Sequence, residues 1–138
     1  MILKPLPKAP EPSTVAAKRL TQLKEQARRF SGTQEVQELD KTFVHLRLLP
    51  REIDRYAPGP HASSYGAIFL FANGRNPALL LVVETDGKEW QYGIGRLSMP
   101  STLEMRLDDT VVWSEPLIPS SPGWTEPYNA SNSPATFP

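Results

Sequence analysis

Apolar and polar residues alternate with a period of two through the middle of the chain, a pattern typical of half-buried β-strands. The first alternating stretch covers residues 42–49 and ends at Pro50. Two further stretches, 65–72 and 78–85, are joined by residues 73–77, which are rich in turn-forming glycine, asparagine and proline. The pattern therefore predicts three successive strands.

Asp86-Gly87 is the strongest turn signal in the chain, because an Asp-Gly pair favours a two-residue hairpin turn. The turn predicts a hairpin with one fully apolar face, on which Val83 opposes Trp90, Leu81 opposes Tyr92 and Leu79 opposes Ile94. The other face carries Gly93 and Gly95, and glycine inside a strand usually marks a close approach by another segment. We expect an N-terminal helix to lie there.

A second hairpin is predicted around Asp108-Asp109, between strands 103–107 and 110–114. Its register sets Trp113 beside Glu104 and Arg106, and it sets Met105 opposite Val112. The strands together form an antiparallel meander of about six strands. With one N-terminal amphipathic helix, they predict the α+β fold class.

That helix is predicted over residues 13–30. Ser13 or Thr14 can cap its first turn, and Gly32 stands where a left-handed C-cap residue is favoured. Its apolar residues recur at spacings of four and three and form one narrow stripe, consisting of Ala16, Leu20, Leu23, Ala27 and Phe30. The stripe predicts packing against the sheet or against a partner helix.

Ten of the 15 prolines lie in the two ends, four in residues 1–12 and six in residues 116–138. Since proline fixes φ and lacks a backbone N–H, both ends are predicted to be extended. The chain therefore divides into a proline-rich N-terminal arm, a single α+β domain over residues 13–115 and a proline-rich C-terminal arm. A domain of this size buries a modest share of its surface and gains stability from partners.

A set of short motifs spans roughly residues 27–113 and comprises Leu46-Arg47-Leu48-Leu49-Pro50, Arg55-Tyr56, Gly66-Ala67-Ile68-Phe69, Gly74 with Pro77, Leu79–Glu84, Trp90-Gln91-Tyr92 and Val112-Trp113. Together these motifs resemble an uncharacterised family of small planctomycete-type bacterial proteins. Asn76 departs from the acidic residue expected before Pro77. The resemblance supports the fold and implies no activity.

The zero net charge conceals an asymmetry along the chain. Residues 1–30 carry seven cations and two anions, whereas the remainder carries eight cations and 13 anions. The predicted helix bears a basic surface made of Lys18, Arg19, Lys24, Arg28 and Arg29. Such a segment can bind nucleic acid or an anionic membrane, or it can dock on the acidic remainder of the chain or on a neighbouring copy.

The sequence contains no set of residues that indicates a particular catalysed reaction. The absence of cysteine excludes disulfides, thiolate metal sites and thiol nucleophiles. His45 and His61 are the only histidines and lack short metal-ligand spacing, so we expect no metal or cofactor. A small enzyme that uses His61, Arg55 and Glu84 around a predicted loop over residues 50–64 stays open as an alternative.

These observations favour a non-enzymatic protein–protein interaction or assembly subunit that docks through its extended ends. Its partner is expected to be protein, either another copy of the chain or a larger assembly. The C-terminal arm carries three aromatic residues and little charge, so Trp124, Tyr128 and Phe137 are predicted partner anchors. A peripheral binder of nucleic acid or membrane through residues 1–30 is a further alternative. Because no apolar run suits a signal peptide or a membrane span, we expect a cytoplasmic protein.

Overall fold

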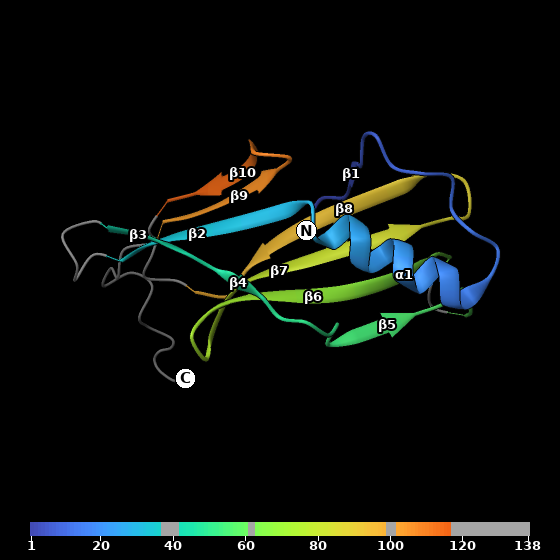
Figure 1. Cartoon of the computed structure of the whole chain (residues 1–138), viewed down its shortest axis with the longest axis horizontal. Helices are drawn as coiled ribbons and strands as arrows, with labels where there is room; N and C mark the ends of the chain where they lie inside the picture. The colour runs from blue at the N-terminus through green and yellow to red at the C-terminus, as the bar shows by residue number, and fades with distance from the viewer. Residues whose placement is uncertain (37–41, 61–62, 99–101, 117–138) are drawn as a thin grey trace.

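The computed structural model describes residues 1–36, 42–60, 63–98 and 102–116, in which one helix and two antiparallel sheets form the fold (Figure 1). Sheet A has the strand order β1-β8-β7-β6-β4, and β5 also pairs with β6. Sheet B has the order β10-β9-β2-β3. In chain order the elements are β1 (Lys4–Pro5), α1 (Ala16–Ala27), β2 (Phe30–Val36), β3 (Thr42–His45), β4 (Arg47–Leu48), β5 (Asp54–Tyr56), β6 (Tyr65–Asn73), β7 (Asn76–Thr85), β8 (Trp90–Arg96), β9 (Leu103–Leu107) and β10 (Thr110–Glu115).

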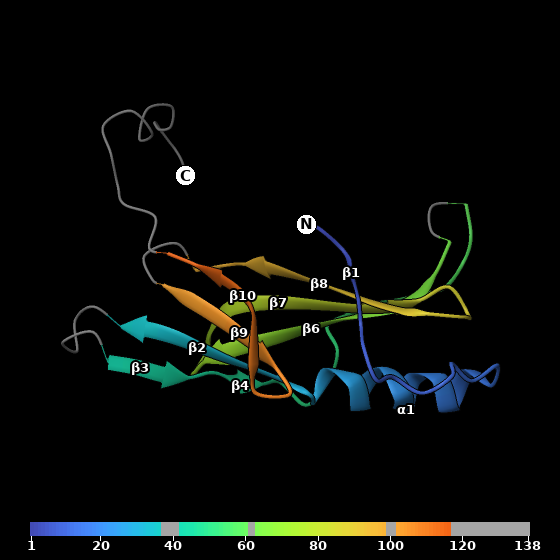
Figure 2. The same ribbon diagram turned by 90° about the horizontal axis from the view of Figure 1, so that it is seen from above.

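Helix α1 and sheet B lie side by side on the same face of sheet A (Figure 2). Alternation along the strands turns one apolar face of each sheet inward. The inward residues form one core, which includes Leu23, Ala27 and Phe30, then Phe69, Phe71, Leu79, Leu81 and Val83, then Tyr92, Ile94, Leu103, Met105 and Leu107. The predicted α+β fold with antiparallel strands is therefore confirmed, although strands β1, β2 and β5 were not predicted.

Strand β2 occupies a segment that the sequence assigns partly to the helix. Helix α1 ends at Ala27, and β2 begins at Phe30. Gly32 therefore ends no helix. It lies within β2, where an added Cβ would stand 3.1 Å from Leu79 Cδ1 and 3.2 Å from Leu46 Cδ1. The glycine lets sheet B pack closely on sheet A.

The helix also begins later than predicted, at Ala16. Val15 holds the N-cap position, and no side chain caps the first turn. The Ser13 hydroxyl accepts a hydrogen bond from the backbone N–H of Val15 at 3.0 Å. This bond shapes the entry to the helix, and it leaves the N–H groups of the first turn without the predicted cap.

The hairpin between β7 and β8 has a four-residue connection, residues 86–89, instead of the predicted two-residue turn. The Asp86 carboxylate accepts hydrogen bonds of 2.9 Å from the backbone N–H groups of Glu89 and Lys88. These bonds hold the wider loop and lower the pKa of Asp86. The cross-strand pairing is shifted by two residues, which keeps the same side chains on the apolar face.

The predicted strand 42–49 bends at Leu46 and joins the two sheets. Its first part, β3, pairs with β2 in sheet B, and its second part, β4, pairs with β6 in sheet A. Leu46 is buried between them, and its backbone N–H donates to the carbonyl oxygen of Gly32 at 2.8 Å. We call this junction of the two sheets the closed seam.

The N-terminal arm packs on its own domain. Strand β1 pairs with β8 at the edge of sheet A, and Leu6 is buried in the core. The indole nitrogen of Trp90 donates to the carbonyl oxygen of Pro10 at 2.7 Å. Of the two predicted arms, this one is therefore bound to the sheet of its own chain. Residues 117–138 of the C-terminal arm, with Trp124, Tyr128 and Phe137, lie outside the described residues.

The segment that covers the glycine-bearing face of β8 is this arm and not helix α1. An added Cβ at Gly93 would stand 2.6 Å from Met1 Sδ and 3.0 Å from Leu3 Cδ2. The expected close approach is real, but the expectation that the helix makes it is wrong. Leu23 and Ala27 of α1 pack into the core on the opposite, apolar face, where burial of the stripe is most favourable.

Candidate functional site

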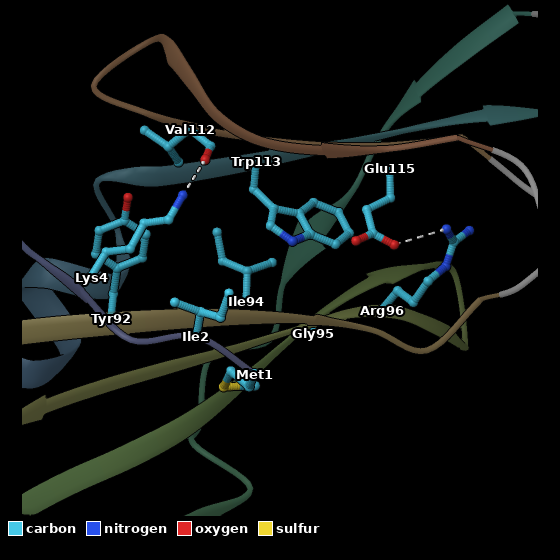
Figure 3. Close-up of a pocket in the computed structure, with 10 residues that line it drawn as sticks. All are labelled: Met1, Ile2, Lys4, Tyr92, Ile94, Gly95, Arg96, Val112, Trp113 and Glu115. Carbon is cyan, nitrogen blue, oxygen red and sulfur yellow. Dashed lines mark hydrogen bonds and ion pairs between the residues drawn. The ribbon is translucent and has the colours of Figure 1, made fainter.

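On the side away from the closed seam, a groove of about 450 Å³ separates β8, the neighbour of the short edge strand β1 in sheet A, from β10, the edge strand of sheet B (Figure 3). We call it the open seam. Trp113 comes from β10 and Ile94 from β8, and their side chains point toward each other. The lining is mainly apolar and consists of Met1, Ile2, Lys4, Tyr92, Ile94, Gly95, Arg96, Val112, Trp113 and Glu115.

A β-bulge in β10 aims Trp113 into this groove. Val111 pairs with Arg106, but Trp113 pairs with Met105, so Val112 is an extra residue in the strand. A one-residue insertion reverses which side chains face inward. The prediction that Trp113 lies beside Glu104 is therefore wrong. The indole instead joins the inward-facing row and lies half-buried against the core.

Two long cationic side chains cross the open seam, one near each end. The Lys4 ammonium donates to the carbonyl oxygen of Val112 at 3.4 Å. At the other end, Arg96 Nη1 lies 3.5 Å from a carboxylate oxygen of Glu115 and donates to the carbonyl oxygen of Pro116 at 2.8 Å. The Lys4 contact joins β1 to β10, and the Arg96 contacts join β8 to the end of β10. No backbone ladder links β8 to β10 in the described part of the chain.

Both edges of the groove offer unpaired backbone groups. Strand β1 pairs with β8 only at Tyr92 and Gln91, so residues 93–95 have no outer neighbour among the described strands. Strand β10 likewise ends sheet B. A free strand edge can pair with an added extended segment. The open seam thus combines backbone hydrogen-bonding groups with an apolar floor, which is the chemistry that recognises an extended polypeptide.

A second cavity, of about 310 Å³, lies between α1, β5 and the start of β6. Its most buried polar group is Arg19, whose guanidinium carbon lies 3.4 Å from the ring centroid of Tyr65. The Tyr56 hydroxyl donates to a Glu84 carboxylate oxygen at 2.6 Å. Burial and this bond raise the pKa of Tyr56. Gly66 has no side chain because the Tyr56 ring occupies that space.

Three of the five residues predicted to form a basic helix surface bind other side chains of the same chain. Arg19 stacks on Tyr65 and is nearly buried. Lys24 lies 3.6 Å from a Glu52 carboxylate oxygen, and Arg29 binds the Asp108 carboxylate through two nitrogens at 2.6 and 3.1 Å. The remaining two, Lys18 and Arg28, are exposed and form no ion pair with a described residue.

Of the three residues proposed for a small enzyme, Arg55 and Glu84 have different partners in the structure. Glu84 binds Tyr56, and Arg55 lies 3.8 Å from Glu52. His61 lies outside the described residues. His45 is exposed on β3, and in the described ranges no three acidic or histidine side chains are grouped in a way that could hold a metal ion. Helix α1 has 12 residues, and no helix in the described ranges is both long and apolar enough to cross a membrane.

The sequence offered partial signals for the residues that line the two cavities. A regular hairpin would leave Trp113 beside charged Glu104, which conflicts with the preference of tryptophan for burial and so hints at the bulge. Arg19 stands four residues before Leu23, so it shares the inward face of α1. Arg96 and Lys4 gave no such signal, since their partners are distant in the sequence.

Comparison of the chain with family models, with curated proteins and with solved structures gave no match.

Proposed function

We propose that the protein is a non-enzymatic, cytoplasmic assembly subunit that associates with copies of itself. In this proposal the open seam of one copy receives the proline-rich C-terminal arm of another, residues 117–138. The observation that carries the proposal is the pair of unpaired strand edges that flank an apolar groove, with Trp113 turned into it by a bulge.

The groove has the chemistry to bind an extended and weakly charged segment. Its floor is apolar at Ile94 and Trp113, and its one carboxylate, Glu115, is engaged by Arg96. Exposed apolar side chains from Met1 and Ile2 extend the rim. An exposed apolar patch with a polar rim is typical of an interaction surface. The bulge adds to this, because bulges often re-aim a side chain at a functional site.

The arm is suited to be the occupant. Its prolines disfavour a helix or a regular sheet of its own, so its backbone carbonyl groups are available to accept hydrogen bonds from a strand edge. It carries Trp124, Tyr128 and Phe137, with Glu126 as its one charged residue. Aromatic residues are the side chains that dominate binding energy at interfaces. An arm that enters the groove of another copy forms a closed dimer if the exchange is mutual, and a ring or an open chain if it is not.

The proposal is tested by light scattering during size-exclusion chromatography of the full chain over a range of concentrations. We expect assembly that weakens by about 30-fold in Kd, or about 2 kcal/mol, when Trp113 becomes alanine. The triple variant Trp124→Ala, Tyr128→Ala and Phe137→Ala should weaken it at least as much.

Phe43→Ala is the matched control, because Phe43 is an exposed aromatic residue on β3 and lies outside the groove. It should assemble like the unmodified chain. Circular dichroism and melting curves check that each variant is folded. A full chain that stays monomeric at every concentration, or a Trp113→Ala variant that assembles normally, would contradict the proposal.

A further inference from the structure

Arg19 is a buried cation without a counter-ion among the described residues. Its exposed fraction is 9%. One nitrogen, Nη1, donates to the carbonyl oxygen of Ser13 at 3.2 Å, and the guanidinium plane covers the ring of Tyr65. No carboxylate in the described ranges lies within ion-pair distance of it. A buried charge is costly unless it is paired, so this arrangement leaves room for an anion.

Two carboxylates close to this cavity are already engaged by other side chains. Glu84 accepts the hydrogen bond of the Tyr56 hydroxyl. Glu52 lies within 4 Å of both Lys24 and Arg55. The lining of the cavity itself contains two arginines and no carboxylate. Its electrostatic potential therefore favours an anionic ligand.

The rest of the lining is apolar or aromatic. Ala16, Leu20 and Leu23 form the helical wall, and Ala57, Tyr56 and Tyr65 lie on the side of the sheet. A volume of about 310 Å³ suits a small organic molecule. Stacking on Tyr65 fixes the guanidinium plane of Arg19, which leaves the Nε and Nη2 donors of its fork for a planar oxyanion.

We propose that this cavity binds a small organic monocarboxylate with an apolar body. The carboxylate pairs with Arg19, Arg55 lies at the rim as a second cation, and the apolar body packs against Leu20 and Leu23. A phosphate group carries more charge than one buried guanidinium and an apolar wall can satisfy. The site is separate from the open seam, so this proposal does not depend on the proposed assembly.

The test is a calorimetric titration of the full chain with phenylacetate, with the neutral 2-phenylethanol and with inorganic phosphate. We expect saturable binding of phenylacetate that is at least about tenfold tighter than binding of either other probe, because a hydrogen-bonded charge pair is lost in the neutral analogue. Arg19→Gln should weaken phenylacetate binding by at least about tenfold. Lys18→Gln is the matched control, since Lys18 is the exposed neighbour outside the lining, and it should bind normally.

Melting curves with and without phenylacetate check the folding of each variant. If Arg19→Gln does not fold, Arg19→Lys keeps the charge but not the fork, and it should still bind at least threefold more weakly than the unmodified chain. Arg55→Gln removes the rim cation at an exposed position and should weaken binding to a smaller extent. Absence of saturable binding, equal binding of 2-phenylethanol, or unchanged binding in folded Arg19 variants would each overturn the proposal.

Discussion

The closed seam and the open seam join the same two sheets in different ways. At the closed seam the chain itself passes from sheet B to sheet A through the buried Leu46, and a backbone hydrogen bond to Gly32 fixes the crossing. At the open seam β8 and the edge strand β10 face each other across a groove, and side chains from Lys4 and Arg96 reach over it. The protein therefore separates a junction that gives stability from a junction that offers a surface.

The two seams should differ in how well they tolerate a mutation or an added polypeptide segment. The closed seam is made of packed apolar side chains and a backbone hydrogen bond, so deletion of atoms there creates a cavity. Of the two cations at the open seam, Lys4 is exposed, so water screens its charge and its contact contributes little free energy. The open seam can therefore adjust to an added segment at a small cost in folding stability, while the core keeps its arrangement.

The largest expected effect is at the closed seam. Leu46→Ala should lower the free energy of unfolding by about 2–5 kcal/mol, because it removes a buried side chain packed against Gly32 and the core. Urea unfolding followed by circular dichroism measures the change. Leu97→Ala is the control at an exposed leucine and should cost less than about 0.5 kcal/mol. Equal losses for the two variants would show that Leu46 contributes no more to the closed seam than an exposed leucine contributes at the surface.

A smaller loss is expected at the open seam. Arg96→Gln removes a guanidinium that donates to the carbonyl oxygens of Ser98 and Pro116 and pairs with Glu115, and we expect a loss of about 1–2 kcal/mol. Arg106→Gln is the control, since that arginine is exposed and pairs only with Glu104 in the described part of the chain. A loss at Arg96 as large as that of Leu46→Ala would show that the open seam carries the fold.

How far the sequence predicts these features depends on how local their causes are. Alternation predicted strands 65–72, 78–85 and 103–107 because a period of two is a property of consecutive residues. The Asp108-Asp109 turn was also predicted, and both residues adopt the positive φ, 50° and 67°, that a primed turn requires. Within hairpins, the pattern and the turn residues were sufficient.

Features that depend on contacts between distant segments could not be predicted from the sequence. Gly93 signalled a close approach, but nothing local showed that Met1 makes it. The bulge that turns Trp113 inward and the stacking of Arg19 on Tyr65 depend on packing between segments far apart in the chain. The width of the 86–89 loop followed from hydrogen bonds of the Asp86 side chain, which compete with the two-residue turn.

The second side-chain contact across the open seam, from Lys4 to Val112, should contribute less to folding stability. Lys4→Met removes one long hydrogen bond of an exposed ammonium to Val112 and keeps the aliphatic stem. We expect a loss of no more than about 0.5 kcal/mol in urea unfolding. Lys88→Met, at an exposed position in the 86–89 loop, serves as the control and should be neutral. A loss above 1 kcal/mol at Lys4 alone would mean that β1 depends on this contact.

The smallest effect is expected at a surface pair outside both seams. The Arg29 guanidinium holds the pKa of Asp108 below its ordinary value, mainly through its hydrogen bonds to the carboxylate. A carboxyl whose folded-state pKa is lowered stabilises the fold above its unfolded-state pKa, and this contribution is lost as the pH falls through the folded-state value. Asp108→Asn should therefore flatten the loss of stability below about pH 4, which urea midpoints at neutral and acidic pH measure.

Asn tolerates the positive φ of position 108, so the variant keeps the turn. Asp109→Asn is the control in the same turn, with no arginine contact among the described residues. An acid response of Asp108→Asn that matches the unmodified chain would show that the pair contributes nothing.

Hydrogen exchange of backbone amides in the full chain, measured at low and at high protein concentration, is the sharpest test of whether copies assemble through the open seam. We expect that the amide of Ile94 in β8 and the outward-facing amides of β10 become protected as copies associate, because an added segment pairs with these edges. The amides of β3, the other edge of sheet B, should exchange at the same rate at both concentrations. Association that leaves β8 and β10 as exposed as in the monomer would contradict the claim that the open seam is the site of assembly.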